Sequence, residues 1–165
     1  MSYTEAIAYF NGIITGTVLF RQYKNKQNVT VIFDIEGPPN KEYACHIHEY
    51  GDLRRGCKSL GPHWNPRNTT HGYTFDTSRP SHAGDLVGNI ILDESGIYRF
   101  IYQDHKITLY DPLSIIGRSI VIHDGIDDLG LGGNEESLKT GNAGGRIDCA
   151  IIGRANNNLF EYQLL

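Results

Sequence analysis

The chain has 165 residues, a length typical of one domain built around one core. Its 19 acidic and 15 basic side chains give a formal net charge of −4, which argues against a nucleic-acid-binding protein. Hydrophobic residues make up 39% of the chain and charged residues 21%, a balance typical of a globular protein rather than a disordered or membrane-spanning one.

At the start of the chain, the first ten residues contain Glu5 and have no basic segment followed by an apolar stretch. We therefore expect no signal peptide and a cytoplasmic location. Apolar runs further along are only a few residues long, which predicts no transmembrane segment and no membrane partner.

The dominant hydrophobic period is two residues, which is the period of β-strands rather than of helices. Turn-forming residues such as Asn11, Gly12, Gly37 and Pro38 separate the apolar segments. We predict eight strands, at residues 6–10, 15–22, 29–35, 43–48, 88–92, 97–102, 118–123 and 149–152. Short strands separated by turns predict an all-β sandwich or barrel.

Two long segments do not fit the strand pattern. Residues 49–83 hold three histidines, four glycines and three prolines, and residues 124–145 hold seven glycines. Loops of this length inside a compact domain are uncommon and are usually functional. We expect a metal or a disulfide to hold them in place.

His46 and His48 lie two residues apart in the predicted strand 43–48. Residues i and i+2 of a strand project from the same face, about 6–7 Å apart, so the two imidazoles can bind one metal ion. Cys45 and Ile47 point to the other face, which argues against Cys45 as a ligand of that metal, although a thiolate would suit copper. On its own, the pair is also compatible with two ordinary polar residues in a strand.

Further side chains that can bind metals follow at irregular spacing. Three imidazoles and one carboxylate form a tetrahedral set that suits zinc: His63, His71, His82 and Asp85. His123 ends the predicted strand 118–123 and can join the pair formed by His46 and His48. His105 lies among polar residues, which predicts an exposed turn histidine. Spacing alone does not establish two metal sites.

Longer motifs are more specific. They read CHIHEYGD at 45–52, GPHWNP at 61–66, HAGDL at 82–86, DDLGLGGNEES at 127–137 and KTGNAGGR at 139–146. In collinear order over about residues 5–153, they resemble the copper/zinc superoxide dismutase family, intracellular eukaryotic type.

This resemblance implies a fold and a reaction. The fold would be an eight-stranded Greek-key β-barrel, an immunoglobulin-like sandwich with two long functional loops, over residues 1–154, followed by a C-terminal extension at 155–165. The reaction would be the disproportionation of superoxide to dioxygen and hydrogen peroxide at a copper ion that is alternately reduced and oxidised. A zinc ion, bridged to the copper through His63, would give structural support.

The resemblance also implies two ligand sets. Copper would be bound by His46, His48, His63 and His123. Zinc would be bound by His63, His71, His82 and Asp85. His63 would use both ring nitrogens and take part in catalysis. All seven ligand positions carry the residue type that the family pattern expects.

Other positions carry family roles by the same resemblance. Asp127 would accept hydrogen bonds from the nitrogens of His46 and His71 that do not bind metal. Arg146 would attract and orient the anionic substrate beside the copper. The loop that shapes the field of the channel would include Glu135, Glu136, Lys139 and Thr140. Cys57 and Cys149 would form a disulfide, leaving Cys45 as a free, buried thiol.

The resemblance further implies a homodimer, with Gly51, Ile116, Gly117, Ile151 and Ile152 at apolar contact positions. No proline follows Pro112, and Gly145 and Ile147 stand where prolines are associated with dependence on a copper chaperone, so copper loading need not require one. Leu131 replaces a common lysine, so part of the family's positive field is missing. In the extension, Phe160, Tyr162 and Leu164 alternate and could add a strand or cover an interface.

Three other functions compete with the enzyme. A non-enzymatic copper-binding relative would typically lack a ligand or Arg146, but this chain has them all. The barrel domain of a copper chaperone would need an N-terminal Cys-x-x-Cys domain, which the sequence lacks. A zinc-stabilised binding module would bind no copper, and visible Cu(II) absorption that reductant bleaches separates it from the enzyme.

Overall fold

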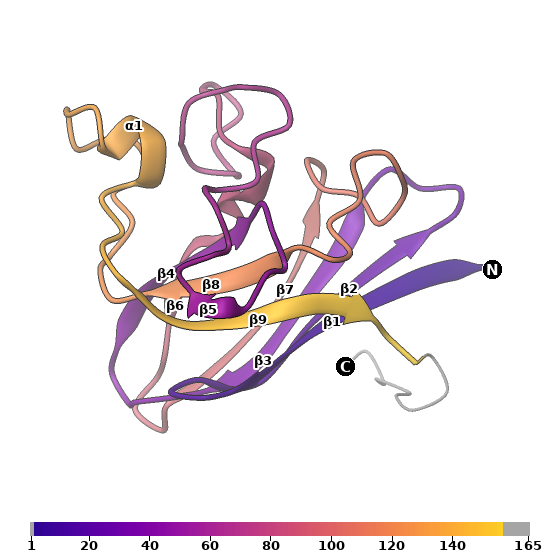
Figure 1. Ribbon diagram of the computed structural model, residues 1–165, viewed down its shortest axis with the longest axis horizontal. Coiled ribbons are helices and arrows are strands. Elements are labelled where there is room, and N and C mark those ends of the chain that lie inside the picture. Colours follow the sequence, from indigo (N-terminus) through magenta and orange to yellow (C-terminus); the bar gives the residue numbers. More distant parts are fainter. Residues whose placement is uncertain (1, 157–165) are drawn as a thin grey trace.

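The computed structural model describes residues 2–156, which form one antiparallel sheet of eight strands. The strand order in the sheet is β6-β4-β8-β9-β1-β2-β3-β7, and the sheet curls into a nearly closed barrel (Figure 1). The strands are β1 Tyr3–Asn11, β2 Thr15–Tyr23, β3 Val29–Glu36, β4 Glu42–His48, β6 Gly88–Ile91, β7 Ile97–Asp104, β8 Ser119–His123 and β9 Arg146–Arg154. The chain crosses between the two halves of the barrel after β3, β6 and β7, as in a Greek key.

All eight predicted strands are present, with ends that differ by a few residues. Three further elements were not predicted: strand β5 at Arg54–Cys57, the 3-10 helix η1 at Ala83–Asp85 and helix α1 at Ser137–Thr140. Each spans four residues or fewer, which is too short for hydrophobic periodicity to mark.

The barrel interior is built by the period-two pattern. Alternate side chains of each strand enter one core, which includes the fully buried rings of Phe10, Phe20 and Phe33. Burying a side chain of this kind stabilises the fold by about 1.5–3 kcal/mol. Cys45 and Ile47 belong to this core, so His46 and His48 must project from the other face of β4. Burial raises the pKa of the Cys45 thiol, which is free.

The two long segments become two loops that rise on the same side of the barrel (Figure 1). The first connects β4 to β6 and carries β5 and η1, and the second connects β8 to β9 and carries α1. The backbone N–H of His71 donates to the carbonyl of Leu138 at 2.8 Å, which joins the two loops directly.

A disulfide between Cys57 and Cys149 ties the first loop to β9, which confirms the predicted pairing. Its two cysteines are 92 residues apart, and a crosslink over that length stabilises the fold by about 4–5 kcal/mol in the chain-entropy model. The disulfide thus holds the base of the first loop against the barrel.

Among residues 2–156, no helix has the length and apolar character needed to cross a membrane. Most of the predicted C-terminal extension, including Phe160, Tyr162 and Leu164, lies outside the described residues. The division of the chain at residue 154 therefore stays a prediction.

Candidate metal centre

Backbone pairing places the first histidines beside one another. Strands β4 and β8 are antiparallel neighbours, and their register pairs His46 with Val121, two residues before His123. Two backbone hydrogen bonds join the segment around His63 to the end of β4. Trp64 N–H donates to the carbonyl of Ile47 at 2.8 Å, and Glu49 N–H donates to the carbonyl of Pro62 at 2.9 Å.

These four histidines form a buried set that we name the four-histidine cluster: His46, His48, His63 and His123. Each offers a ring nitrogen, and these nitrogens all lie within 4.8 Å of one another. The Nε2 atoms of His48 and His123 are 3.2 Å apart. The predicted copper-ligand set is therefore brought together in space.

Oxygen atoms fix which nitrogen of each ring faces this cluster. His46 Nε2 donates to Asp127 at 2.7 Å, and His48 Nδ1 donates to the carbonyl of Gly61 at 2.8 Å. His123 Nδ1 lies 3.4 Å from the carbonyl of Gly144. The opposite nitrogen of each ring then carries a free lone pair. In the described part of the chain, buried His46 Nδ1 and His63 Nε2 have no hydrogen-bond partner, so both are suited to a cation.

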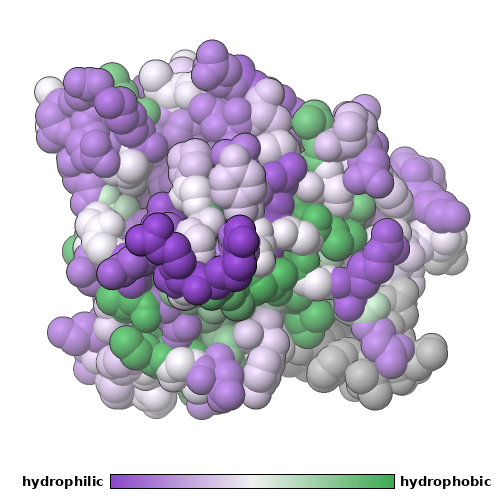
Figure 2. Space-filling view, in the orientation of Figure 1, coloured by the Kyte–Doolittle hydropathy of each residue, from purple (hydrophilic) through white to green (hydrophobic). Residues whose placement is uncertain are grey.

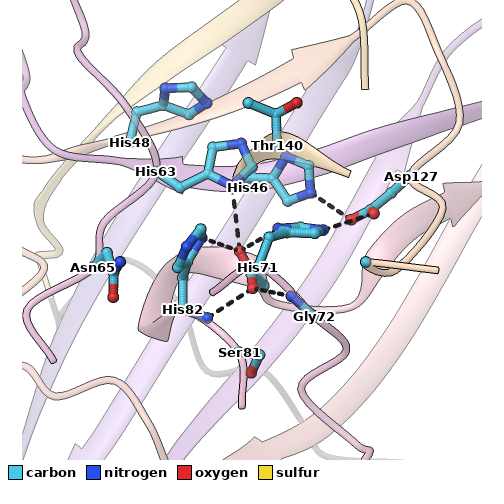
Figure 3. A network of polar contacts seen from close by, with 12 residues as sticks. His46, His48, His63, Asn65, His71, Gly72, Ser81, His82, Asp127 and Thr140 are labelled. Atoms are coloured by element: carbon cyan, nitrogen blue, oxygen red, sulfur yellow. Dashed lines mark hydrogen bonds and ion pairs between the residues drawn. The ribbon is translucent and has the colours of Figure 1, made fainter. Parts of the chain in front are cut away.

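A second buried set, the histidine–aspartate cluster, contains His63, His71, His82 and Asp85. Asp85 Oδ1 lies 3.2 Å from His63 Nδ1 and 2.9 Å from Nδ1 of both His71 and His82. Figure 3 shows the three rings converging on this carboxylate oxygen. Three nitrogens and one oxygen make a closed set that fits tetrahedral zinc.

Asp85 is held in this position by its own backbone environment. It ends the short helix η1, and its second oxygen accepts hydrogen bonds from the backbone N–H groups of His82 at 2.7 Å and Gly72 at 3.0 Å. His63 belongs to both clusters, with Nδ1 toward Asp85 and Nε2 toward the four-histidine cluster.

Asp127 connects the two clusters a second time. Its two carboxylate oxygens accept hydrogen bonds from His46 Nε2 at 2.7 Å and from His71 Nε2 at 2.8 Å, as predicted (Figure 3). A Cβ at Gly141 would lie 2.0 Å from Asp127 Oδ1, and Gly141 has a φ of +68°, so glycine is required there.

Asn89 is a supporting residue that sequence reasoning missed. Its side-chain oxygen accepts from Asp127 N–H at 2.8 Å, and its side-chain nitrogen donates to the Asp127 carbonyl at 3.0 Å. The only sequence signal was a polar residue inside the apolar strand at 88–92, which is too common to indicate a role.

Burial sets the protonation of the four-histidine cluster. Desolvation lowers the pKa of His46, His63 and His123, and it lowers the pKa of His48 to about 2. These rings are therefore neutral at physiological pH, which is the form that binds metals.

The histidine–aspartate cluster differs because it contains charge. Burial raises the pKa of Asp85, but hydrogen bonds from the surrounding histidines outweigh it and hold that pKa well below its usual range. Burial lowers the pKa of His71, yet its hydrogen bonds with Asp127 and Asp85 prevail and raise the pKa to about 9. A buried anionic carboxylate thus lies among imidazole rings, and its charge favours binding of a cation at the centre of the histidine–aspartate cluster.

A cavity of about 1090 Å³ gives access to the four-histidine cluster. His48, His63 and His123 line it, together with Arg146. All the predicted loop residues line it as well: Glu135, Glu136, Lys139 and Thr140. Lys139 makes an ion pair with Glu135 at 2.5 Å.

Arg146 is fixed at the wall of this cavity by two carbonyls. Its guanidinium donates to the carbonyl of Cys57 at 2.7 Å and to that of Gly61 at 2.5 Å. The disulfide at Cys57 therefore also positions the arginine. His105, by contrast, is exposed in a bend outside both clusters, as predicted.

Residues 14–152 match the family described as copper/zinc superoxide dismutase (SODC). The chain belongs to this family. The Cu-Zn superoxide dismutases of Saccharomyces cerevisiae and Candida glabrata are 47% and 46% identical to it over 155 residues, a span of 92% of this chain and 99% of each relative. The Cu-Zn superoxide dismutase of Paramecium bursaria Chlorella virus 1 is 49% identical over 93% of this chain and 80% of its own length.

A solved structure described as "Crystal Structure Analysis of the clock protein EA4" superimposes with a TM-score of 0.85 at 42% identity, covering 94% of this chain and 97% of that chain. As a copper/zinc superoxide dismutase, the chain is an oxidoreductase that disproportionates superoxide and takes copper and zinc as cofactors.

Proposed function

We propose that the four-histidine cluster binds copper, that the histidine–aspartate cluster binds zinc, and that superoxide reacts at the cavity end of the copper site. The observation that carries this assignment is the pair of buried nitrogens without a hydrogen-bond partner, His46 Nδ1 and His63 Nε2. A buried polar atom without a partner is costly, and a metal bound there would remove that cost.

Copper, when bound, supplies a one-electron redox couple, and zinc, which has no redox chemistry, supplies a fixed positive charge. Two superoxide ions and two protons give one dioxygen and one hydrogen peroxide. His63 holds a proton at Nε2 between the two halves of this reaction and donates it toward the peroxide product. Its Nδ1 stays directed at the zinc site, so the ring keeps its orientation while the proton is present.

Arg146 is the substrate-orienting residue in this proposal. Its guanidinium lines the cavity with His48 and His123, and its planar donors suit a small anion. The carbonyls of Cys57 and Gly61 hold it in place, so little conformational freedom is lost when superoxide arrives. Lys139 and Thr140 on the opposite loop, with Glu135 and Glu136, set the field at the cavity entrance.

The test of the assignment is metal analysis paired with superoxide decay on protein reconstituted with both metals. His123→Ala removes one ligand of the four-histidine cluster and should abolish superoxide decay while zinc is retained. His105→Ala removes an exposed histidine outside both clusters and should change neither metal content nor rate. Activity that survives His123→Ala would overturn the copper assignment.

A homodimer is also proposed, with Gly51, Gly117 and Ile151 among its contacts. Figure 2 presents an apolar band over β9 beside a strongly hydrophilic group over β5, which is a suitable surface for a second copy. A Cβ at Gly51 would lie 2.2 Å from the carbonyl of Gly117, so these two segments already pack closely within one chain. A monomer mass by light scattering at micromolar concentration would contradict the dimer.

We further propose a cytoplasmic location and copper loading without a dedicated chaperone. Gly145 and Ile147 support the second point, because neither is the proline associated with that dependence. Expression in cells that lack the chaperone should give active, copper-loaded enzyme. Inactive, copper-poor protein from those cells would refute the proposal.

A further inference from the structure

A second cavity, of about 450 Å³, lies outside the metal centre and is named here the basic cavity. Three segments far apart in the sequence line it: the turn between β2 and β3, the first long loop and the connection that follows β7. The basic and aromatic residues that line it include Lys26, Trp64, Arg67, Lys106 and Tyr110. Its volume is within the range of small-molecule binding sites.

The charged side chains described along this cavity are basic. Lys26, Arg67 and Lys106 line the cavity together with His105, and among residues 2–156 no aspartate or glutamate does. This is unexpected in a chain with 19 acidic and 15 basic residues. Within residues 2–156, none of these three cations forms an ion pair, whereas exposed arginines elsewhere, such as Arg99 with Asp34, do.

Lys106 lacks a carboxylate partner although it is partly buried. Its ammonium donates to the hydroxyl of Ser81. Burial lowers the pKa of Lys106, and the positive charge of Arg67 lowers it further. The carboxylates that raise its pKa, chiefly Asp85 and Asp104, are buried and already accept hydrogen bonds from other residues.

The side chain of Gln22 holds together two of the segments that line the cavity. This buried side chain donates to the carbonyls of Lys26 at 3.3 Å and Gln27 at 3.0 Å, and it accepts from Leu109 N–H at 2.7 Å and Thr108 Oγ1 at 3.0 Å. It therefore joins the turn that carries Lys26 to the connection after β7. A preformed site loses less conformational entropy when it binds a ligand.

Two aromatic side chains form another part of the wall. Tyr110 and Trp64 line the cavity, and the guanidinium of Arg118 lies 3.1 Å from the centroid of a Trp64 ring. Trp64 also lines the cavity at the metal centre, so it stands between the two. Aromatic surface beside convergent cations suits a ligand that has an anionic group and an organic part.

We propose that the basic cavity binds a small phosphate-bearing molecule of nucleotide size, with its phosphates between Lys26, Arg67 and Lys106 and its organic part against Trp64 and Tyr110. Three cations without carboxylate partners supply the charge-assisted hydrogen bonds that phosphate oxygens accept. This binding is separate from superoxide chemistry and does not depend on the metal assignment.

The test uses the fluorescence of Trp64, which is the single tryptophan of the chain. Metal-loaded enzyme is titrated with ADP and with inorganic pyrophosphate at low ionic strength, because salt screens exposed charges. We expect a saturable change with both probes and tighter binding of ADP. In the double variant Lys26→Gln/Arg67→Gln, we expect affinity for both probes to fall at least about tenfold.

Two controls locate the binding. Lys24→Gln/Lys41→Gln removes the same charge from exposed positions outside the cavity, and it should leave the affinity within about twofold of wild type. Arg146→Gln tests the alternative that the anions bind beside the metals. The proposal is overturned if wild type shows no saturable change at millimolar ADP, if Lys26→Gln/Arg67→Gln binds as tightly as wild type, or if Arg146→Gln alone abolishes the signal.

Discussion

The two metal clusters share His63 and are both buried, yet they differ in how they meet solvent. Three residues of the four-histidine cluster line the large cavity; in the other cluster His63 and His82 line it, whereas Asp85 and His71 do not. The histidine–aspartate cluster converges on one carboxylate oxygen, while the four-histidine cluster contains unpartnered nitrogens. A closed set with a carboxylate is typical of a structural zinc site, and a set open to a cavity is typical of a catalytic one.

One histidine, His63, belongs to both clusters and connects them. His63 enters through backbone bonds to β4, while its Nδ1 faces a carboxylate that is fixed by η1. The histidine–aspartate cluster therefore orients the His63 ring, whose other nitrogen faces the four-histidine cluster. Asp127 connects the two clusters a second time, because its carboxylate accepts hydrogen bonds from His46 and His71. The geometry of each cluster therefore depends on the other.

The largest effect is expected from the residue that the clusters share. In the proposed assignment His63→Ala removes a ligand from both sites, so superoxide decay should fall to the uncatalysed background and both metals should bind more weakly. Metal stoichiometry and superoxide decay on the reconstituted variant measure this. Full loading of both metals in the variant would show that the clusters are independent.

A smaller effect is expected at Asp127, which contacts both clusters without being assigned to either metal. Asp127→Ala frees His46 Nε2 and His71 Nε2, and loss of such a partner lowers metal affinity about 10- to 100-fold. Competition with a chelator measures both affinities. If only one affinity falls, Asp127 acts on one cluster and does not connect them.

A still smaller effect is expected at Arg146, which we propose to orient the substrate beside the four-histidine cluster. Arg146→Ala should lower the rate about tenfold, because a charged cleft concentrates an anionic substrate by at least that factor. Inhibition by small anions should weaken in parallel. Unchanged sensitivity to anions would remove Arg146 from the orienting role.

The smallest effect is expected at Lys139, which lines the cavity at the metal centre. Lys139 is paired with Glu135, so Lys139→Gln should lower the rate only about two- to threefold at low ionic strength, and salt should remove the difference. Lys24→Gln, which lies outside this cavity, is the matched control. An equal loss in both variants would indicate an effect of net charge rather than of position.

The period-two pattern, with core residues such as Phe20 and Phe33 at alternating positions, predicted an all-β sandwich or barrel, and the family resemblance implied the Greek-key barrel. Both clusters were implied by the resemblance of the short motifs that carry their histidines and Asp85. The sequence could not predict Asn89, since a single polar residue in a strand has no distinctive signal. The basic cavity was also missed, because Lys26, Arg67 and Lys106 come from three segments that only the fold brings together.

The most direct test of the difference between the clusters is a paired measurement of metal content and superoxide decay on His123→Ala and His82→Ala. We predict that His123→Ala loses copper and all activity but keeps zinc. We predict that His82→Ala loses zinc and thermal stability while it keeps copper, visible Cu(II) absorption and part of the activity. Activity retained by His123→Ala, or copper lost from His82→Ala while zinc stays bound, would contradict these predictions.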